Sequence, residues 1–242
     1  MSEHIKPYDS DRTKKEQVSD MFDTISEEYD GLNRAITFGI DKSWRKRLIN
    51  MAAEKHPNKV LDIASGTGDL AILMAQKTEA QEIIGADISE GMLNVGRQKI
   101  KKLQYDDRIS MQVADSESLP FDSNYFDVVT VAFGVRNFEN LDQGLKEIYR
   151  VLKPGGIFLV LETSVPKYPI IKQFYLLHSH TILPLFGRLF SKDPKAYQYL
   201  SKSAQKFPYG KAFNNILKKN GFKEVKDHPQ FFGAATIYNA QK

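Results

Sequence analysis

Hydrophobic residues in the first quarter of the chain recur every three or four positions, which is the spacing of one helix face. The first stripe consists of Val18, Met21, Phe22, Ile25 and Tyr29. A second helix is predicted to contain Trp44, Leu48, Ile49 and Met51. We therefore expect a helical cap over residues 18–56, preceded by a polar and mobile segment, residues 1–17.

From residue 58 onward the pattern changes to short buried strands that alternate with helices. Five strands are predicted, at residues 59–64, 82–87, 109–113, 126–131 and 157–161. The intervening helices are predicted at residues 69–76, 90–102 and 141–152. This alternation is typical of a doubly wound α/β fold with a mostly parallel sheet.

The alternation stops over residues 163–210, where aromatic residues, prolines and lysines are frequent. It resumes with a helix at residues 212–220 and two strands, at 222–227 and 234–239. Residues 1–242 are therefore predicted to form one domain around a seven-stranded sheet. Its parts after the N-terminal cap are a core at residues 58–162, an inserted cap at 163–210 and the last helix and strands at 211–242.

The composition agrees with one soluble globular domain of 242 residues, with 41% hydrophobic and 26% charged residues. The absence of cysteine excludes disulfides, thiolate zinc sites and a cysteine nucleophile. A net charge of +4 is too small to indicate a nucleic-acid partner. No stretch resembles a signal peptide or the roughly 20 apolar residues of a membrane span, so we expect a cytoplasmic protein.

A glycine-rich turn follows the first strand of the core. Asp62 lies at the end of that strand, and Gly66, Thr67 and Gly68 lead into the next helix. Such glycines let a ligand approach the backbone, and the helix N-terminus offers free N–H groups. Asp87 ends the second strand, where a carboxylate can accept hydrogen bonds from both hydroxyls of a ribose. The pattern predicts binding of NAD or S-adenosylmethionine, with a plain tight turn and a helix-capping aspartate as the alternative.

Two later segments favour S-adenosylmethionine. Asp115 and Ser116 follow the third strand, and a Lys-Pro-Gly-Gly turn, residues 153–156, precedes the fifth. Together with the glycine turn these resemble the class I S-adenosylmethionine-dependent methyltransferases over residues 58–162. The resemblance implies that Asp115 binds adenine. Ala64 stands where these enzymes usually have the first glycine of the turn.

Three more segments narrow the resemblance. They are residues 29–37 with the following Trp44, the Phe-Gly-Val-Arg-Asn sequence at 133–137, and residues 150–156 with the following Glu162. They resemble the UbiE/MenG family of quinone C-methyltransferases, from about Val18 to Lys242. The resemblance implies methylation of demethylmenaquinol, the last step of menaquinone synthesis. A dual enzyme that also methylates a ubiquinone precursor stays open.

Methylation of a ring carbon requires orientation of the reactants and loss of a phenolic proton from the quinol. The resemblance implies that Arg136 and Asn137 line the quinol pocket. Arg136 would stabilise a phenolate or hold a water that takes the proton, since a guanidinium is a poor base. The alternative is that Arg136 pairs structurally with a carboxylate. Tyr29 is expected to cover the cofactor or bind the quinol, with a helix-end network as the alternative.

Other functions are consistent with the glycine turn taken alone. An NAD-dependent oxidoreductase and a non-catalytic protein that binds adenosyl compounds are the two alternatives. The spacing of the five histidines does not indicate a metal site, and an activated sulfonium needs no metal. A homodimer is an open expectation.

A long acid-free stretch separates Glu162 from Asp193, and it is rich in apolar residues, including Phe186 and Phe190. Residues 192–226 then contain nine lysines and two acids. This pattern predicts an access route for an isoprenoid tail, with peripheral contact at the inner face of the cell membrane. The alternative is a packed cap helix beside a solvated basic face.

Overall fold

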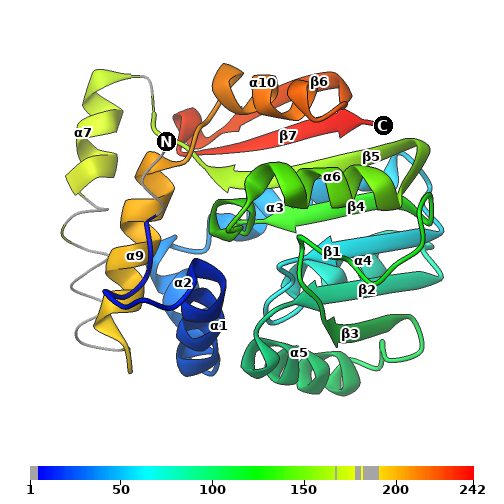
Figure 1. Cartoon of the computed structure of the whole chain (residues 1–242), viewed down its shortest axis with the longest axis horizontal. Helices are drawn as coiled ribbons and strands as arrows, with labels where there is room; N and C mark the ends of the chain where they lie inside the picture. The colour runs from blue at the N-terminus through cyan, green and yellow to red at the C-terminus, as the bar shows by residue number, and fades with distance from the viewer. Residues whose placement is uncertain (1–4, 167, 178–180, 182–190) are drawn as a thin grey trace.

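A seven-stranded sheet in the order β3-β2-β1-β4-β5-β7-β6 forms the centre of the computed structural model (Figure 1). The structure describes residues 5–166, 168–177, 181 and 191–242. The strands are β1 (Lys59–Ile63), β2 (Glu82–Asp87), β3 (Ile109–Val113), β4 (Phe126–Ala132), β5 (Leu152–Thr163), β6 (Lys223–Gln230) and β7 (Ala235–Gln241). The first five are parallel, and β7 runs antiparallel between β5 and β6. The predicted mostly parallel, seven-stranded α/β fold is confirmed.

The helices of the described residues cover both faces of this sheet and its carboxyl edge. They are α1 (Lys14–Ile25), α2 (Tyr29–Ile36), α3 (Asp41–Ala53), α4 (Asp69–Lys77), α5 (Glu90–Lys102), α6 (Leu141–Val151), α7 (Pro169–Leu177), α9 (Pro194–Lys206) and α10 (Lys211–Lys219). The described ranges also contain the short 3-10 turns η1 (Val135–Asn137) and η3 (Phe231–Gly233). Because helices lie on both faces, the central strands are hydrophobic on both sides.

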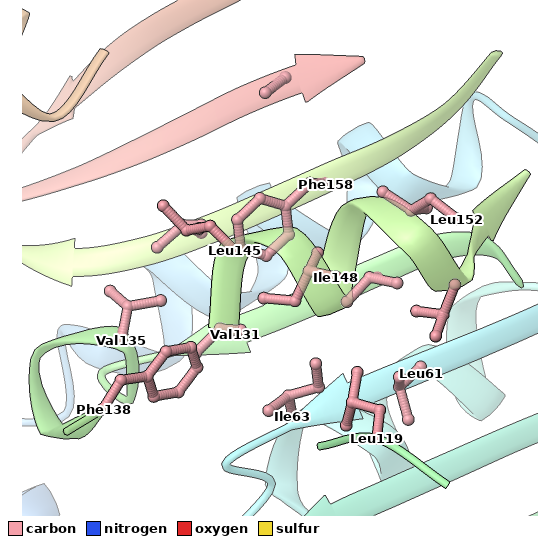
Figure 2. Close-up of a cluster of buried hydrophobic side chains, with 14 of the residues drawn as sticks. Leu61, Ile63, Leu119, Val131, Val135, Phe138, Leu145, Ile148, Leu152 and Phe158 are labelled. Carbon is pink, nitrogen blue, oxygen red and sulfur yellow. The ribbon is translucent and has the colours of Figure 1, made fainter. Parts of the chain in front are cut away.

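Two hydrophobic cores flank the sheet. One contains Leu145 and Ile148 of α6, and Figure 2 shows them beside Val131 of β4 and Phe158 of β5. The other core packs α3, α4 and α5 against the opposite face. Alternating strand residues divide between the two cores, which explains the short apolar runs that predicted the strands.

The N-terminal region differs from its prediction in two respects. The segment at residues 1–17 was expected to be mobile, but α1 already begins at Lys14. Thr13 and Glu16 form a capping box, a local signal that stabilises a helix start. The helical stripe that ran on to Tyr29 is split between α1, which ends at Ile25, and α2, which begins at Tyr29.

The fifth strand is longer than predicted. β5 begins at Leu152 because that residue already pairs with Phe126 of β4, and it continues to Thr163 because β7 pairs along it. These pairings join residues distant in the sequence, so local hydrophobicity showed only the middle of the strand.

A third apolar cluster joins the N-terminal helices to the inserted segment. Val18 and Met21 of α1 and Ile36 of α2 pack against Tyr197 and Tyr199 of α9. Figure 1 shows α1, α2 and α9 as a layer beside the ends of the parallel strands. The two predicted caps therefore form one layer over the carboxyl edge of the sheet. Over the described ranges, no helix is both long and apolar enough to span a bilayer.

Candidate active site

A pocket lies beneath this layer at the carboxyl ends of β1, β2 and β4, with about 640 Å³ of empty volume that is partly open to solvent. The strand order reverses at this edge, between β1 and β4, which is where ligands bind in open α/β sheets. Six of the ten residues predicted for the site line the pocket, namely Tyr29, Gly66, Asp87, Asp115, Ser116 and Asn137. The other four, Asp62, Thr67, Gly68 and Arg136, lie outside its lining.

The glycine turn has the backbone conformation that its sequence suggests. Gly66 and Gly68 have φ of 57° and 77°, values that favour glycine. Ala64 also has a positive φ of 52°. An alanine in this left-handed region costs about 1 kcal/mol, so the turn holds some strain at this residue.

Asp87 is the buried carboxylate of this pocket. Its two oxygens accept the backbone N–H groups of Gly66, at 2.8 Å, and of Ser89, at 3.0 Å. Burial raises the pKa of Asp87, and these hydrogen bonds oppose the rise. Each oxygen retains a lone pair, so the carboxylate can accept further hydrogen bonds from a ligand.

Asp62 instead supports the turn from below. It accepts hydrogen bonds from Ser65 Oγ at 2.8 Å and from Thr130 Oγ1 at 2.7 Å. Burial raises its pKa to about 6. The structure therefore places Asp62 as a support of the turn rather than as part of the pocket wall.

Thr67 connects the turn to the helical cap, whereas Gly68 is the N-cap residue of α4. The Thr67 hydroxyl donates to Asp30 of α2 at 2.7 Å, and Lys99 of α5 donates to the same carboxylate at 2.8 Å. Lys99 also contacts Asp69, the first residue of α4. The turn is thereby bound to α2 through side chains that sequence reasoning did not connect.

Helix α1 covers the pocket through polar contacts as well as apolar ones. Lys15 lines the pocket and forms an ion pair with Asp115. Asp23 accepts hydrogen bonds from Ser89 Oγ, at 2.6 Å, and from the backbone N–H of Gly91, at 2.8 Å. These α1 residues were missed, since no spacing in the sequence links them to residues 66 to 100 positions away.

The residues expected to act on the substrate converge behind and beside the pocket. Arg136 Nη1 donates to the Phe133 carbonyl at 2.7 Å and to Glu162 at 2.6 Å. Asn137 accepts a hydrogen bond from the Tyr199 hydroxyl at 3.1 Å. Tyr29 lies close enough to Arg136 for that charge to lower its pKa, although burial raises the pKa more. The carboxylate pairing weighed for Arg136 as an alternative is thus present.

No cluster of three metal-ligating side chains is found in the part of the chain that the structure describes. The polar groups at the pocket are backbone N–H donors, carboxylate acceptors and hydroxyls that can do both. Such groups suit a nucleoside with amino and hydroxyl substituents.

Comparison with known proteins identifies the family. Residues 10–242 match the ubiE/COQ5 methyltransferase family. The chain belongs to this family. It is 46% identical over 240 residues to a demethylmenaquinone methyltransferase of Bacteroides fragilis, covering 99% of this chain and 98% of the relative. It is 43% identical to a ubiquinone/menaquinone biosynthesis C-methyltransferase UbiE of Geotalea daltonii, over 95% and 97% of the two chains.

The fold also agrees with solved methyltransferases. A SAM-dependent methyltransferase from Aquifex aeolicus superimposes with a TM-score of 0.54 at 17% identity, covering 75% of this chain and 80% of that one. The resemblance to the UbiE/MenG quinone methyltransferases is therefore confirmed at the level of family and fold. As a ubiE/COQ5 family member the chain is a methyltransferase, and the oxidoreductase alternative receives no support from these relatives.

Proposed function

We propose that this protein transfers a methyl group from S-adenosylmethionine to a ring carbon of demethylmenaquinol, the last step of menaquinone biosynthesis. The observation that carries the proposal is the 46% identity to a demethylmenaquinone methyltransferase over nearly the whole of both chains. Similarity of that extent includes the cap that covers the pocket as well as the cofactor-binding core. The polar groups that line the pocket also support the proposal.

The pocket residues fit S-adenosylmethionine. Asp87 has free lone pairs for ribose hydroxyls, and Gly66, Asp115 and Ser116 line the adjoining wall. When bound, the cofactor supplies a methyl group already activated on a sulfonium.

The chain itself must orient the quinol and stabilise its phenolate, which makes the ring carbon a better nucleophile. Arg136 supplies a permanent positive charge in a region that excludes water. Its Nε is buried and has no hydrogen-bond partner among the described residues. Arg136 lies behind the pocket wall to which its neighbours Gly134 and Asn137 belong, so its charge acts on the substrate from behind that wall. Asn137 and Tyr29 line the pocket and can orient the quinol hydroxyls.

The direct test is turnover with a short-tail demethylmenaquinol, S-adenosylmethionine and the purified protein. Only the reduced quinol should be methylated, because the quinone ring is electron-poor. Product mass with and without a reductant measures this. Equal product in both conditions would contradict the proposed chemistry.

Arg136→Ala gives a second test at the same site. Loss of a preorganised charge typically lowers turnover by about 10² to 10³. The dissociation constant for S-adenosylmethionine, measured by calorimetry, should change little. If turnover stays near that of the natural sequence, Arg136 has a structural role only.

A second candidate function is the dual one, in which a ubiquinone precursor is also methylated. It is favoured by the 43% identity to the relative named for both pathways. The same assay with a ubiquinone-precursor quinol decides between them. Lipids of a strain lacking the gene add a cellular test, since accumulation of demethylmenaquinone alone would support the narrower function.

We also propose peripheral contact with an anionic membrane, because a prenylated quinol resides in a bilayer. Exposed apolar side chains lie around α7, namely Tyr168, Ile170 and Leu177, and in η3, namely Phe231 and Phe232. Ser164 Oγ donates to the Gly233 carbonyl at 2.8 Å, which joins η3 to the segment that follows β5 and leads to α7. Phe186 and Phe190, predicted from the sequence for this contact, lie outside the described residues.

A further inference from the structure

Glu162 is a completely buried acid near the carboxyl end of β5. Its Oε1 atom accepts three hydrogen bonds, from Arg136 Nη1 at 2.6 Å, from the Thr163 backbone N–H at 2.8 Å and from the Thr163 hydroxyl at 3.1 Å. The ion pair joins β5 to η1, two segments 26 residues apart in the chain. The carboxylate is therefore held rigidly by its own strand and holds Arg136 in turn.

Stability alone does not account for this pair. Removing two charges from water is costly, and replacing a buried ion pair by apolar residues is often neutral or stabilising. The pair is also incompletely satisfied, because Arg136 Nε and Glu162 Oε2 are both buried without a partner among the described residues. Buried polar atoms without hydrogen bonds destabilise the folded state, so their presence here indicates a functional role for the pair.

The surroundings connect the pair to the proposed substrate site. Arg136 lies between Gly134 and Asn137, which both line the pocket. Tyr29 of α2 and Tyr199 of α9 lie near the guanidinium, whose charge lowers the pKa of each against the larger effect of burial. Residues of α2, α9, β5 and η1 thus meet around the positive charge of Arg136.

A guanidinium is planar, and its N–H groups keep fixed directions relative to one another. Because Nη1 is bound to both Glu162 and the Phe133 carbonyl, the direction of the unpartnered Nε–H is fixed as well. Preorganisation of a donor in this way contributes to catalysis when charge develops on a substrate oxygen.

We propose that Glu162 is a positioning residue for methyl transfer, which holds Arg136 in the orientation that stabilises the quinol phenolate. The inference rests on the proposed function. It assigns to Glu162 no contact with the substrate, so any effect on turnover must pass through Arg136.

The experiment compares kcat, KM and cofactor binding of Glu162→Gln with those of the natural sequence. Glutamine keeps the shape but removes the charge, so kcat should fall about 10- to 100-fold, within the range for a misaligned donor. KM and the dissociation constant for S-adenosylmethionine should stay within about threefold, about 0.7 kcal/mol. Glu147→Gln is the matched control, since Glu147 pairs with Arg150 on α6 and should leave kcat unchanged.

A double variant separates positioning from an independent role. In the Arg136→Ala background, Glu162→Gln should lower kcat no further. Multiplied losses, or a near-natural kcat in Glu162→Gln, would overturn the inference. If Glu162→Gln no longer binds the cofactor, Glu162→Asp replaces it in the test. Aspartate keeps the negative charge but places it one methylene farther from Arg136. It should lower kcat with cofactor binding retained, and a natural kcat would likewise overturn the inference.

The natural sequence serves as the reference for the proposed function. If it fails to methylate demethylmenaquinol, the proposed function fails. If it is active and Glu162→Gln is equally active, only the positioning role fails.

Discussion

Asp62 and Asp87 lie at the ends of adjacent parallel strands, yet their surroundings assign them different tasks. Asp87 faces the pocket and accepts backbone N–H groups, whereas Asp62 accepts two hydroxyl groups beneath the turn. Sequence position suggested the same cofactor role for both. Only the side-chain partners distinguish them.

Asp87→Ala should weaken S-adenosylmethionine binding by about 2 kcal/mol or more, because ribose hydroxyls lose a charged acceptor. Calorimetry measures the dissociation constant directly. Asp106→Ala, in an exposed loop, is the control and should bind normally. An unchanged dissociation constant in a folded Asp87→Ala protein would remove this residue from the site.

Asp62→Asn should change how stability depends on pH. The pKa of Asp62 rises from 3.8 to about 6 on folding, so the native state binds more protons between these values. Its contribution to stability is therefore present below about pH 4 and is lost as the pH rises through 6. Asparagine does not ionise, so the variant should gain stability relative to the natural protein over this interval, by at most about 3 kcal/mol.

Thermal unfolding of both proteins at pH 4.5 and pH 7.5 tests this expectation. At a single pH, which of the two proteins has the higher Tm depends on how well the asparagine accepts the hydrogen bonds of Ser65 and Thr130. The difference between the two Tm values should nevertheless shift in favour of the variant at the higher pH. A difference that is independent of pH would show that Asp62 keeps an ordinary pKa.

At the scale of elements, α1 covers the pocket that is proposed to bind the cofactor. Its carboxylate Asp23 lies at the N-terminal end of α5, where it binds Ser89 and the Gly91 N–H. The positive end of a helix dipole favours a carboxylate at this place. Helix α1 is thereby joined to the short loop that follows Asp87.

Asp23→Ala should loosen α1 and weaken cofactor binding about 3- to 10-fold, since a capping contact is worth about 1 kcal/mol. The cofactor should also dissociate faster, and amide hydrogens of α1 should exchange faster. Asp20→Ala is the control on the same helix, because its pair with Arg12 is about half exposed and such pairs contribute little. Equal effects of the two variants would show that the α5 contact has no special role.

At the scale of the whole molecule, exposed aromatic residues gather at the carboxyl edge that also bears the pocket. Phe231 and Phe232 of η3 are 53% and 61% exposed, and both have a positive φ. Figure 1 shows η3, in red, at the same edge as α7. Arg47 donates to Gln230 next to η3, at 3.3 Å, and adds positive charge.

Replacing Phe231 and Phe232 by serine should reduce sedimentation with anionic liposomes. It should also lower activity on long-tail quinols more than on short-tail ones, since buried apolar area supports membrane contact. Salt should weaken the binding of the natural protein without abolishing it, because each basic residue near the surface adds only about 1 kcal/mol.

The control for this test is Leu103→Ser, a 48% exposed residue at the C-terminal end of α5, on the opposite edge of the sheet. It should leave liposome binding unchanged. If the double variant loses activity equally on both substrates while remaining folded, η3 has no part in access to the membrane.

The sequence by itself determined the elements whose signals are local. The bounds of β2 and α5 were predicted as observed, because strand hydrophobicity and the N-cap Ser89 are both properties of short segments. Gly66, Asp87 and Asp115 could be predicted for the same reason, since each follows directly from a strand that ends at the pocket. The family resemblance was likewise carried by short motifs along the chain.

Only the tertiary structure decided which distant residues meet. Pairing with β4 and β7 set the length of β5, and packing of α9 against α1 and α2 joined two predicted caps into one. The contacts of Lys15 with Asp115 and of Arg136 with Glu162 arise in the same way. Such contacts depend on how whole helices and strands pack. A local pattern of hydrophobic and polar residues does not show which distant residue a side chain will contact.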